Sequence, residues 1–277
     1  MADGVQIVGD AWGDPADPPA LLFHGGGQTR HAWKSTAAVL ARHGYHAMAV
    51  DLRGHGDSGW SPDGNYAPDR FAADVRQMAT SLGRKPILIG ASLGGVSSLI
   101  AAGEAPQPIA RALVLVDITP KIDPAGVSRI RGFMAAHIDD GFGSLEEAAD
   151  AIAEYLPHRR RPKSLDGLRK NLRLGGDGRY RWHYDPALVH DPSRQRDPNR
   201  EARLTKAAQN LDVPLLLVRG ASSELVSAEI AREFVAKVPG ARYVDVHGAS
   251  HMVAGDVNDP FTDQVVAFLD GLPRDRA

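Results

Sequence analysis

The sequence predicts an α/β fold in which helices surround a buried, mostly parallel sheet. Three observations support this class. Short apolar runs alternate with longer stretches of helical period along most of the chain. Gly, Pro or Asp residues bound most of these runs. The length of 277 residues and the 43% hydrophobic content suit one elaborated domain, or a core with a smaller insert.

Seven runs are expected to be strands because they are short, apolar and bounded by turn-forming residues. They are 5–12, 20–24, 46–51, 86–91, 112–117, 213–219 and 241–247. Five helices are expected between or after them, because apolar residues recur there at spacings of three and four. These helices are 31–42, 68–82, 94–102, 227–237 and 260–269.

The alternation stops between Ile118 and Leu211, where helical patterns occur without a convincing buried strand. This break predicts an inserted helical cap. We assign 1–119 and 206–277 to the core and 120–205 to the cap.

Two helices are expected inside the cap. Ser144 and Glu147 have the spacing of a capping box ahead of an apolar helical pattern. Ser164 stands in a capping position before a second pattern that includes Leu165 and Leu168. These two signals predict where the cap helices begin.

Aromatic residues in the cap suggest a substrate pocket. Tyr180, Trp182 and Tyr184 alternate with polar residues, which places them on one side of an extended segment. We expect Trp182, Phe133 and Met252 to line the pocket. Packing of the cap onto the core explains the aromatic residues equally well, because aromatic side chains dominate packing in any protein.

The charge and the cysteine count exclude several classes of function. Lys and Arg total 32 against 34 Asp and Glu, so no positive field attracts nucleic acid or an anionic membrane. The absence of cysteine excludes disulfides, thiolate nucleophiles and Cys-bound metals, and it fits a reducing cytoplasm. The first twenty residues contain four Asp and no apolar core, so we expect no secretory signal. The expected partner is a small-molecule substrate, with no nucleic acid, membrane, cofactor or metal.

Ser92 is the candidate nucleophile. It stands in the sequence Gly-Ala-Ser-Leu-Gly at 90–94, between an apolar strand pattern and a helical pattern. A sharp strand-to-helix turn projects its central side chain away from the backbone and requires small neighbours. The motif alone is weak, and its position between a strand and a helix makes it informative.

His251 is the candidate general base, since an unassisted serine hydroxyl needs a group to accept its proton. It follows the last expected strand, whereas His247 lies within that strand pattern. The imidazole in turn needs a carboxylate to fix its tautomer. We prefer Glu224, in the loop after the penultimate strand, and keep Asp117, at the end of a neighbouring strand, as the alternative acid.

The developing negative charge on a substrate oxygen needs fixed donors. Three glycines follow His24 after an apolar strand pattern, and their backbone N–H groups are unobstructed by side chains. We expect the N–H groups of Gly26 and Leu93 to form an oxyanion hole, with Leu93 also at the positive end of a helix. His24 itself is expected to order the loop.

Together these motifs resemble the α/β-hydrolase superfamily. They comprise the glycine loop after His24, the stretch Asp-Leu-Arg-Gly-His-Gly-Asp-Ser at 51–58, the Ser92 turn, Val-Arg-Gly at 218–220, and His251. The second stretch is similar to the haloperoxidase, epoxide-hydrolase and ring-cleavage-product hydrolase branches. The resemblance implies a doubly wound sheet of seven or eight strands, and the short amino-terminal lead favours seven.

Two departures narrow what the resemblance implies. Epoxide hydrolases and haloalkane dehalogenases of this type carry aspartate at the position of Ser92, so those activities are not expected. Most relatives carry Asp where this chain has Glu224, which keeps Asp117 open as the acid.

The leading hypothesis is a serine hydrolase that cleaves an ester, lactone or related carbonyl compound through an acyl-enzyme, with a Ser-His-Glu triad. A first alternative, which the resemblance implies, is hydrolysis of a carbon–carbon bond or cofactor-free perhydrolysis or haloperoxidation. A second alternative is a noncatalytic ligand-binding receptor, because a fold does not dictate an activity.

Overall fold

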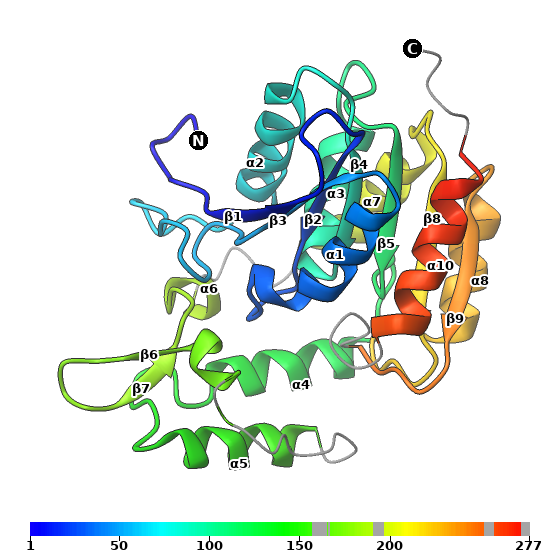
Figure 1. Cartoon of the computed structure of the whole chain (residues 1–277). Coiled ribbons are helices and arrows are strands. Elements are labelled where there is room, and N and C mark those ends of the chain that lie inside the picture. Colours follow the sequence, from blue (N-terminus) through cyan, green and yellow to red (C-terminus); the bar gives the residue numbers. More distant parts are fainter. Residues whose placement is uncertain (157–164, 166, 191–196, 252–257, 273–277) are drawn as a thin grey trace.

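A computed structural model describes the chain except for residues 157–164, 166, 191–196, 252–257 and 273–277. Within the described residues, the central sheet has seven strands in the order β1-β3-β2-β4-β5-β8-β9 (Figure 1). The strands are β1 Gly9–Trp12, β2 Pro19–Phe23, β3 His46–Val50, β4 Ile87–Ala91, β5 Ala112–Val116, β8 Leu215–Gly220 and β9 Arg242–Val246.

The sheet is mostly parallel, as the sequence predicts. Only β1 runs antiparallel to its neighbour, β3, and the other five pairings are parallel. Each strand of this sheet overlaps one of the seven apolar runs. The predicted fold class is therefore confirmed, with seven strands in the central sheet of the described part of the chain.

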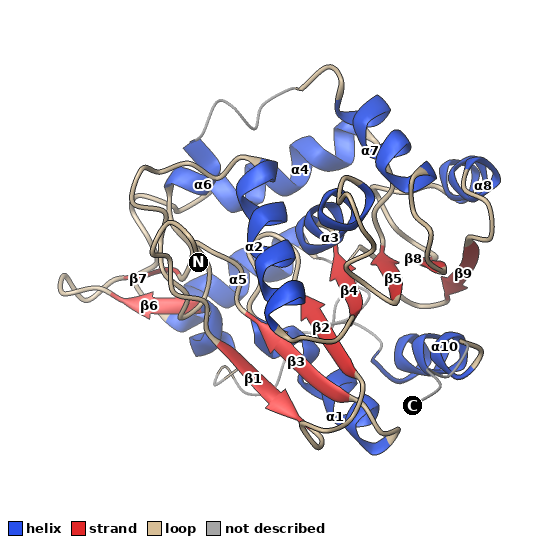
Figure 2. Ribbon diagram, turned by 90° about the horizontal axis from the view of Figure 1, so that it is seen from above, coloured by secondary structure: helices blue, strands red, loops and turns tan. Residues whose placement is uncertain are grey.

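Helices cover both faces of the sheet (Figure 2). One face carries α2 Pro68–Ser81, α3 Leu93–Gly103, α7 Arg200–Gln209 and α8 Ala228–Lys237. The other face carries the 3-10 turn η1 Arg30–Trp33, α1 Lys34–Arg42 and α10 Asn258–Asp270. This arrangement is the doubly wound architecture expected for parallel strands that are buried on both faces.

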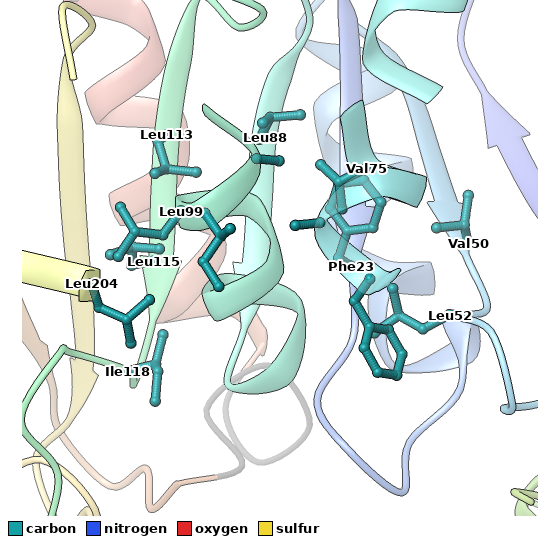
Figure 3. Close-up of a cluster of buried hydrophobic side chains, with 14 of the residues drawn as sticks. Phe23, Val50, Leu52, Val75, Leu88, Leu99, Leu113, Leu115, Ile118 and Leu204 are labelled. Carbon is teal, nitrogen blue, oxygen red and sulfur yellow. The ribbon is translucent and has the colours of Figure 1, made fainter. Parts of the chain in front are cut away.

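The strands divide their apolar side chains between two cores because successive residues point to opposite faces. Leu21 and Phe23 pack with α2 and α3, whereas Ala20 and Leu22 pack with α1 and α10. Figure 3 shows the first core, in which Phe23 lies near Val75 of α2.

The chain between β5 and β8 forms α4 Pro124–Ala135, α5 Leu145–Tyr155, η2 Leu168–Asn171, β6 Leu172–Leu174, β7 Tyr180–Trp182, α6 Ala187–His190 and then α7. Figure 1 shows α4, α5 and the β6–β7 hairpin grouped beneath the sheet. The predicted helix start is confirmed at α5: the Ser144 hydroxyl accepts the N–H of Glu147 at 3.1 Å, and the Glu147 carboxylate accepts the N–H of Gly143 at 2.6 Å.

The prediction of a second cap helix after Ser164 is wrong for the residues that the structure describes. Ser164 lies outside them, and the apolar pattern that follows forms the short turn η2 and strand β6. Leu172 pairs with Trp182 across the antiparallel hairpin, so a tertiary partner overrides the local helical spacing.

The helix α7 crosses the expected boundary between core and cap at 205/206. It packs closely against α3, since a Cβ on Gly103 would lie 2.1 Å from the Ala207 carbonyl oxygen. The division into core and cap stays a prediction.

Candidate active site

Ser92 occupies a strained turn between β4 and α3. Its backbone has φ 45° and ψ −108°, a conformation that residues other than glycine rarely adopt. The turn is tight because Gly90 and Gly94 lie against backbone: a Cβ on Gly90 would lie 2.5 Å from the Gly94 carbonyl carbon, and one on Gly94 would lie 2.4 Å from Phe23 oxygen. This is the geometry that the sequence motif predicts.

The glycine loop lies beside Ser92. A Cβ built on Gly25 would lie 3.5 Å from the Cβ of Ser92. The loop is closed internally, because Gly25 N–H donates to the Gln28 side-chain oxygen at 2.9 Å and Gln28 N–H donates to Gly25 oxygen at 3.1 Å. Within the described part of the chain, the N–H groups of Gly26 and Leu93 have no hydrogen-bond acceptor. One unbonded backbone donor therefore lies in the loop beside Ser92, and the other belongs to the residue directly after Ser92.

His251 contacts Asp117. Its Nδ1 lies 2.7 Å from Asp117 Oδ2, and the Asp117 carboxylate is fully buried. When this carboxylate is ionised it can only accept, so Nδ1 carries the proton and Nε2 remains free to act as a base. The contact therefore fixes the tautomer that a serine hydrolase requires.

Asp117 is held rigidly from three sides. It has φ 49° directly after β5, and its N–H donates to Val218 oxygen at 2.7 Å. Gly220 N–H donates to Oδ1 at 3.0 Å, and the Ser223 hydroxyl donates to Oδ2 at 2.5 Å. These donors stabilise the ionised carboxylate and set its position against the imidazole ring.

Glu224 does not take the position expected of it. In the described structure the carboxylate bonded to His251 belongs to Asp117, the alternative. The turn after β8 explains the difference: the Ser223 hydroxyl accepts the N–H groups of Leu225 and Val226, which directs Ser223, and not Glu224, to the site. Glu224 instead lies near Tyr155 of α5, where burial of the phenol, together with the negative charge of Glu224, raises the pKa of Tyr155 to about 12.

Ser92 and His251 reach the same strand end by separate contacts. Ser92 N–H donates to Val116 oxygen at 3.1 Å, and the His251 ring contacts the next residue, Asp117. Among the residues that the structure describes, no hydrogen bond joins the Ser92 hydroxyl to the imidazole. Catalytic hydrogen bonds of this kind are commonly long before substrate binds.

The segment between β5 and β8 contains a cluster of aromatic side chains that pack against one another. Phe133 of α4 stacks on Tyr155, with ring centroids 4.1 Å apart, and lies 5.6 Å from the Trp182 ring. Trp182 is buried, and its indole N–H donates to Ala136 oxygen at 3.2 Å. Pocket lining by Phe133 and Trp182 stays a prediction, and Met252 lies outside the described residues.

Two residues of the segment between β5 and β8, which the sequence did not single out for the glycine loop, contact it directly. A Cβ on Gly27 would lie 3.5 Å from Met134 Cε and 3.6 Å from Tyr184 Cε1. The Tyr184 hydroxyl also donates to Met134 oxygen at 2.8 Å. Neither contact has a sequence signature, because both depend on how the insert folds back over the sheet.

Two further features of the described residues are relevant to function. They contain no cluster of His, Asp or Glu arranged to hold a metal ion. Nor do they include a helix with the length and apolar character needed to traverse a bilayer.

The chain belongs to the α/β-hydrolase fold family, whose sequence pattern it matches over residues 18–256. It is 32% identical to an esterase of Mycobacterium tuberculosis over 94% of this chain and 85% of the esterase. It is 30% identical to the 3-hydroxybutyrate-oligomer hydrolase of Cupriavidus necator over 87% of this chain and 85% of that protein. The resemblance seen in the motifs is thus confirmed.

The solved structures agree. The crystal structure of E-2-(acetamidomethylene)succinate hydrolase superposes with a TM-score of 0.78 and 26% identity, covering 96% of each chain. Its counterpart in the curated relatives, from Mesorhizobium japonicum, is 30% identical over 91% of this chain and 88% of that protein. These relatives are esterases and hydrolases, which supports hydrolase activity for this chain.

Proposed function

We propose that this protein is a serine hydrolase that cleaves carboxylic esters through an acyl-enzyme. The observation that carries the proposal is the 2.7 Å contact between His251 Nδ1 and the buried Asp117 carboxylate, at the strand end to which the strained Ser92 turn is also bonded. The esterase relatives support the same class of reaction.

In the acylation step, Ser92 Oγ attacks the ester carbonyl carbon while His251 Nε2 takes its proton. The carbonyl oxygen becomes negative and is stabilised by the N–H groups of Gly26 and Leu93. The intermediate then expels the alkoxide, which receives the proton from His251 and leaves as the alcohol. Asp117 stays ionised and stabilises the imidazolium.

Deacylation repeats these steps with water as the nucleophile. His251 removes a proton from water, the hydroxide attacks the acyl carbon, and Ser92 Oγ leaves with the proton returned by His251. The products are a carboxylic acid and the free enzyme. Asp117 replaces Glu224 as the acid in this proposal.

The first test is Ser92→Ala, with Ser98→Ala as the matched control. Ser98 is a buried serine of α3, the helix that begins directly after Ser92, and among the described residues its hydroxyl bonds only to Gly94 oxygen, at 2.8 Å. We expect Ser92→Ala to lower kcat for a short nitrophenyl ester by about 10⁴-fold or more, because the nucleophile is lost. We expect the Ser98 variant to lose less than about threefold. Both should retain a cooperative thermal melt.

A fluorophosphonate probe read by peptide mass spectrometry gives the second test. Labelling confined to Ser92 supports the proposal. Turnover that survives in Ser92→Ala would refute it. A wild-type protein that binds a ligand without labelling or ester turnover would favour a receptor.

A substrate panel of esters, vinylogous diketones, and peroxide with a short carboxylate separates ester cleavage from carbon–carbon cleavage and perhydrolysis.

A further inference from the structure

Three buried histidines surround the glycine loop, and the proposed reaction uses none of them. His24 follows β2, His55 follows β3, and His183 follows β7 in the insert. Their rings form a chain, with centroids 5.0 Å apart for His24 and His55 and 5.9 Å apart for His55 and His183. Three sequence-distant segments therefore converge on one loop through imidazole rings.

Each ring bonds to one backbone carbonyl and to one backbone N–H. His24 donates through Nδ1 to Gly25 oxygen at 2.8 Å and accepts Leu52 N–H at 2.9 Å. His55 faces Arg53 oxygen with Nδ1 at 3.0 Å and accepts Gly27 N–H at 3.2 Å. A ring that donates to a carbonyl and accepts from an amide is neutral, with its tautomer fixed by these partners.

His183 completes the set from the insert. Its Nε2 donates to Gly27 oxygen at 3.1 Å, and its Nδ1 accepts Gly56 N–H at 2.7 Å. Burial lowers the pKa of His183 to about 4, which keeps the ring neutral at physiological pH. The side chain is 2% exposed. Gly27 is thus held on both sides, by His55 at its N–H and by His183 at its carbonyl.

These contacts determine the direction of the proposed oxyanion donor, the Gly26 N–H, because peptide groups are planar and trans. The carbonyl of Gly25 and the N–H of Gly26 belong to one peptide plane and point in opposite directions. Fixing the Gly25 carbonyl with His24 therefore aims the Gly26 N–H. Glycine has little intrinsic conformational preference, and Gly27 has φ +78°, so the loop depends on such external bonds for its shape.

The Gly27 carbonyl shares a peptide plane with the Gln28 N–H, and that N–H donates to the Gly25 oxygen at 3.1 Å. We propose that His183 is a positioning residue: by holding the Gly27 carbonyl, it fixes the Gln28 N–H and through it the Gly25 carbonyl, which keeps the Gly26 N–H aimed at the substrate oxygen and couples the insert to the oxyanion hole. The inference rests on the proposed function for its catalytic consequence. The β6–β7 hairpin supports the coupling, since the Arg173 guanidinium on β6 bonds to Gly56 oxygen and the N–H of His183 bonds to Asn171 oxygen at 3.1 Å.

The test compares two substitutions that each keep one half of the ring's bonding. Glutamine places an N–H donor near the position of Nε2, so His183→Gln retains the bond to Gly27. Asparagine places an acceptor near Nδ1, so His183→Asn retains the bond to Gly56 and leaves the Gly27 carbonyl without its donor. The exposed His190, which lies a short distance along the same segment, receives the same two substitutions as the control.

We expect His183→Asn to lower kcat about tenfold to a hundredfold with KM changed less than threefold, because misplaced oxyanion donors weaken only the transition state. His183→Gln should stay within about threefold of wild type. Equal kinetics for the two variants, or losses of kcat that only follow losses in melting temperature, would overturn the proposal. The His190 variants should match wild type.

A readout without turnover separates this inference from the proposed function. In ¹⁵N NMR spectra, the wild-type His183 ring should show a protonated Nε2 and an unprotonated Nδ1. The backbone amide signals of Gly26 and Gly27 should move more in His183→Asn than in His183→Gln. Unmoved amide signals would reject the positioning role even if the protein hydrolyses esters. Moved signals without any wild-type turnover would reject the hydrolase proposal alone.

Discussion

At the scale of single residues, the carboxylate of Asp117 has the most demanding environment. It is fully buried, yet it receives a backbone N–H, a serine hydroxyl and the His251 ring. A buried charge is tolerated only when donors of this kind replace its water. Its arrangement is therefore built to hold an anion against the ring.

Replacing Asp117 with Asn tests this role. The amide cannot stabilise an imidazolium, and it favours the wrong ring tautomer, so we expect kcat to fall by roughly 10³- to 10⁴-fold. Glu224→Gln is the matched control, with an expected change of less than about threefold. Measurements of kcat for ester hydrolysis at several pH values compare the two variants with the wild type. If Glu224→Gln is the more damaging change, Asp117 is not the acid.

The sequence analysis selects Ser92 and His251 and prefers Glu224 as the acid, whereas in the described structure Asp117 is the carboxylate that contacts His251. Both Asp117 and Glu224 follow a strand and precede His251 in the chain. The Ser223 hydroxyl determines which acid lies at the site, because it closes the turn after β8 and donates to Asp117. A serine among small residues carries no signal of such a contact.

At the scale of elements, α4 is seated by one close backbone contact. A Cβ on Gly126 would lie 2.3 Å from the Glu224 carbonyl oxygen, while Gly132 of the same helix has nothing within 4 Å. The Asp123 side chain caps the helix at the N–H groups of Ala125 and Gly126. The helix therefore meets the β8–α8 loop at its first turn.

These two glycines give opposite predictions. Gly126→Ala must push α4 away from the loop, so we expect a lower melting temperature and a lower kcat/KM. Gly132→Ala should raise the free energy of unfolding by about 0.5–1 kcal/mol, because alanine favours helix and nothing obstructs it. Thermal melts and ester kinetics measure both changes. A Gly126 variant as stable as the Gly132 variant would contradict the close seating of α4.

The strands of the central sheet and the start of α5 follow from local sequence pattern, whereas the β6–β7 hairpin of the insert does not. The runs around β4 and β5 are apolar throughout because both faces of the sheet are covered, and that property is visible in the sequence. The spacing of Leu165, Leu168 and Leu172 also fits a helix, but Leu172 joins a hairpin. Short amphipathic segments take the structure that their tertiary partners select.

At the scale of the whole molecule, buried polar side chains join segments that are far apart in the sequence. The Arg53 guanidinium pairs with Asp74 of α2 and with Asp3 near the amino terminus. His183 joins the insert to the loops after β2 and β3. The contact between His183 and Gly27 joins residues 156 positions apart in the sequence, so no local sequence pattern predicts it.

The buried histidines also predict how stability depends on pH. Burial lowers the pKa of His24 and that of His183, the latter to about 4, against about 6.5 in the unfolded chain. Between these values the unfolded state binds more protons than the folded state, so the free energy of unfolding falls as the pH falls. His24 and Arg173 face His183 and lower its pKa further, while Asp51 and the bond to Gly27 oppose them.

His183→Gln tests this dependence because it removes one titrating ring and keeps the bond to Gly27. From pH 6.5 to 4, we expect the wild type to lose roughly 3 kcal/mol more than the variant, the value of the shift of the His183 pKa. Urea unfolding at several pH values gives the two curves, with His190→Gln as the exposed control. Parallel curves for wild type and His183→Gln would show that the ring takes up its proton without unfolding, and would contradict a neutral His183 at the join between insert and core.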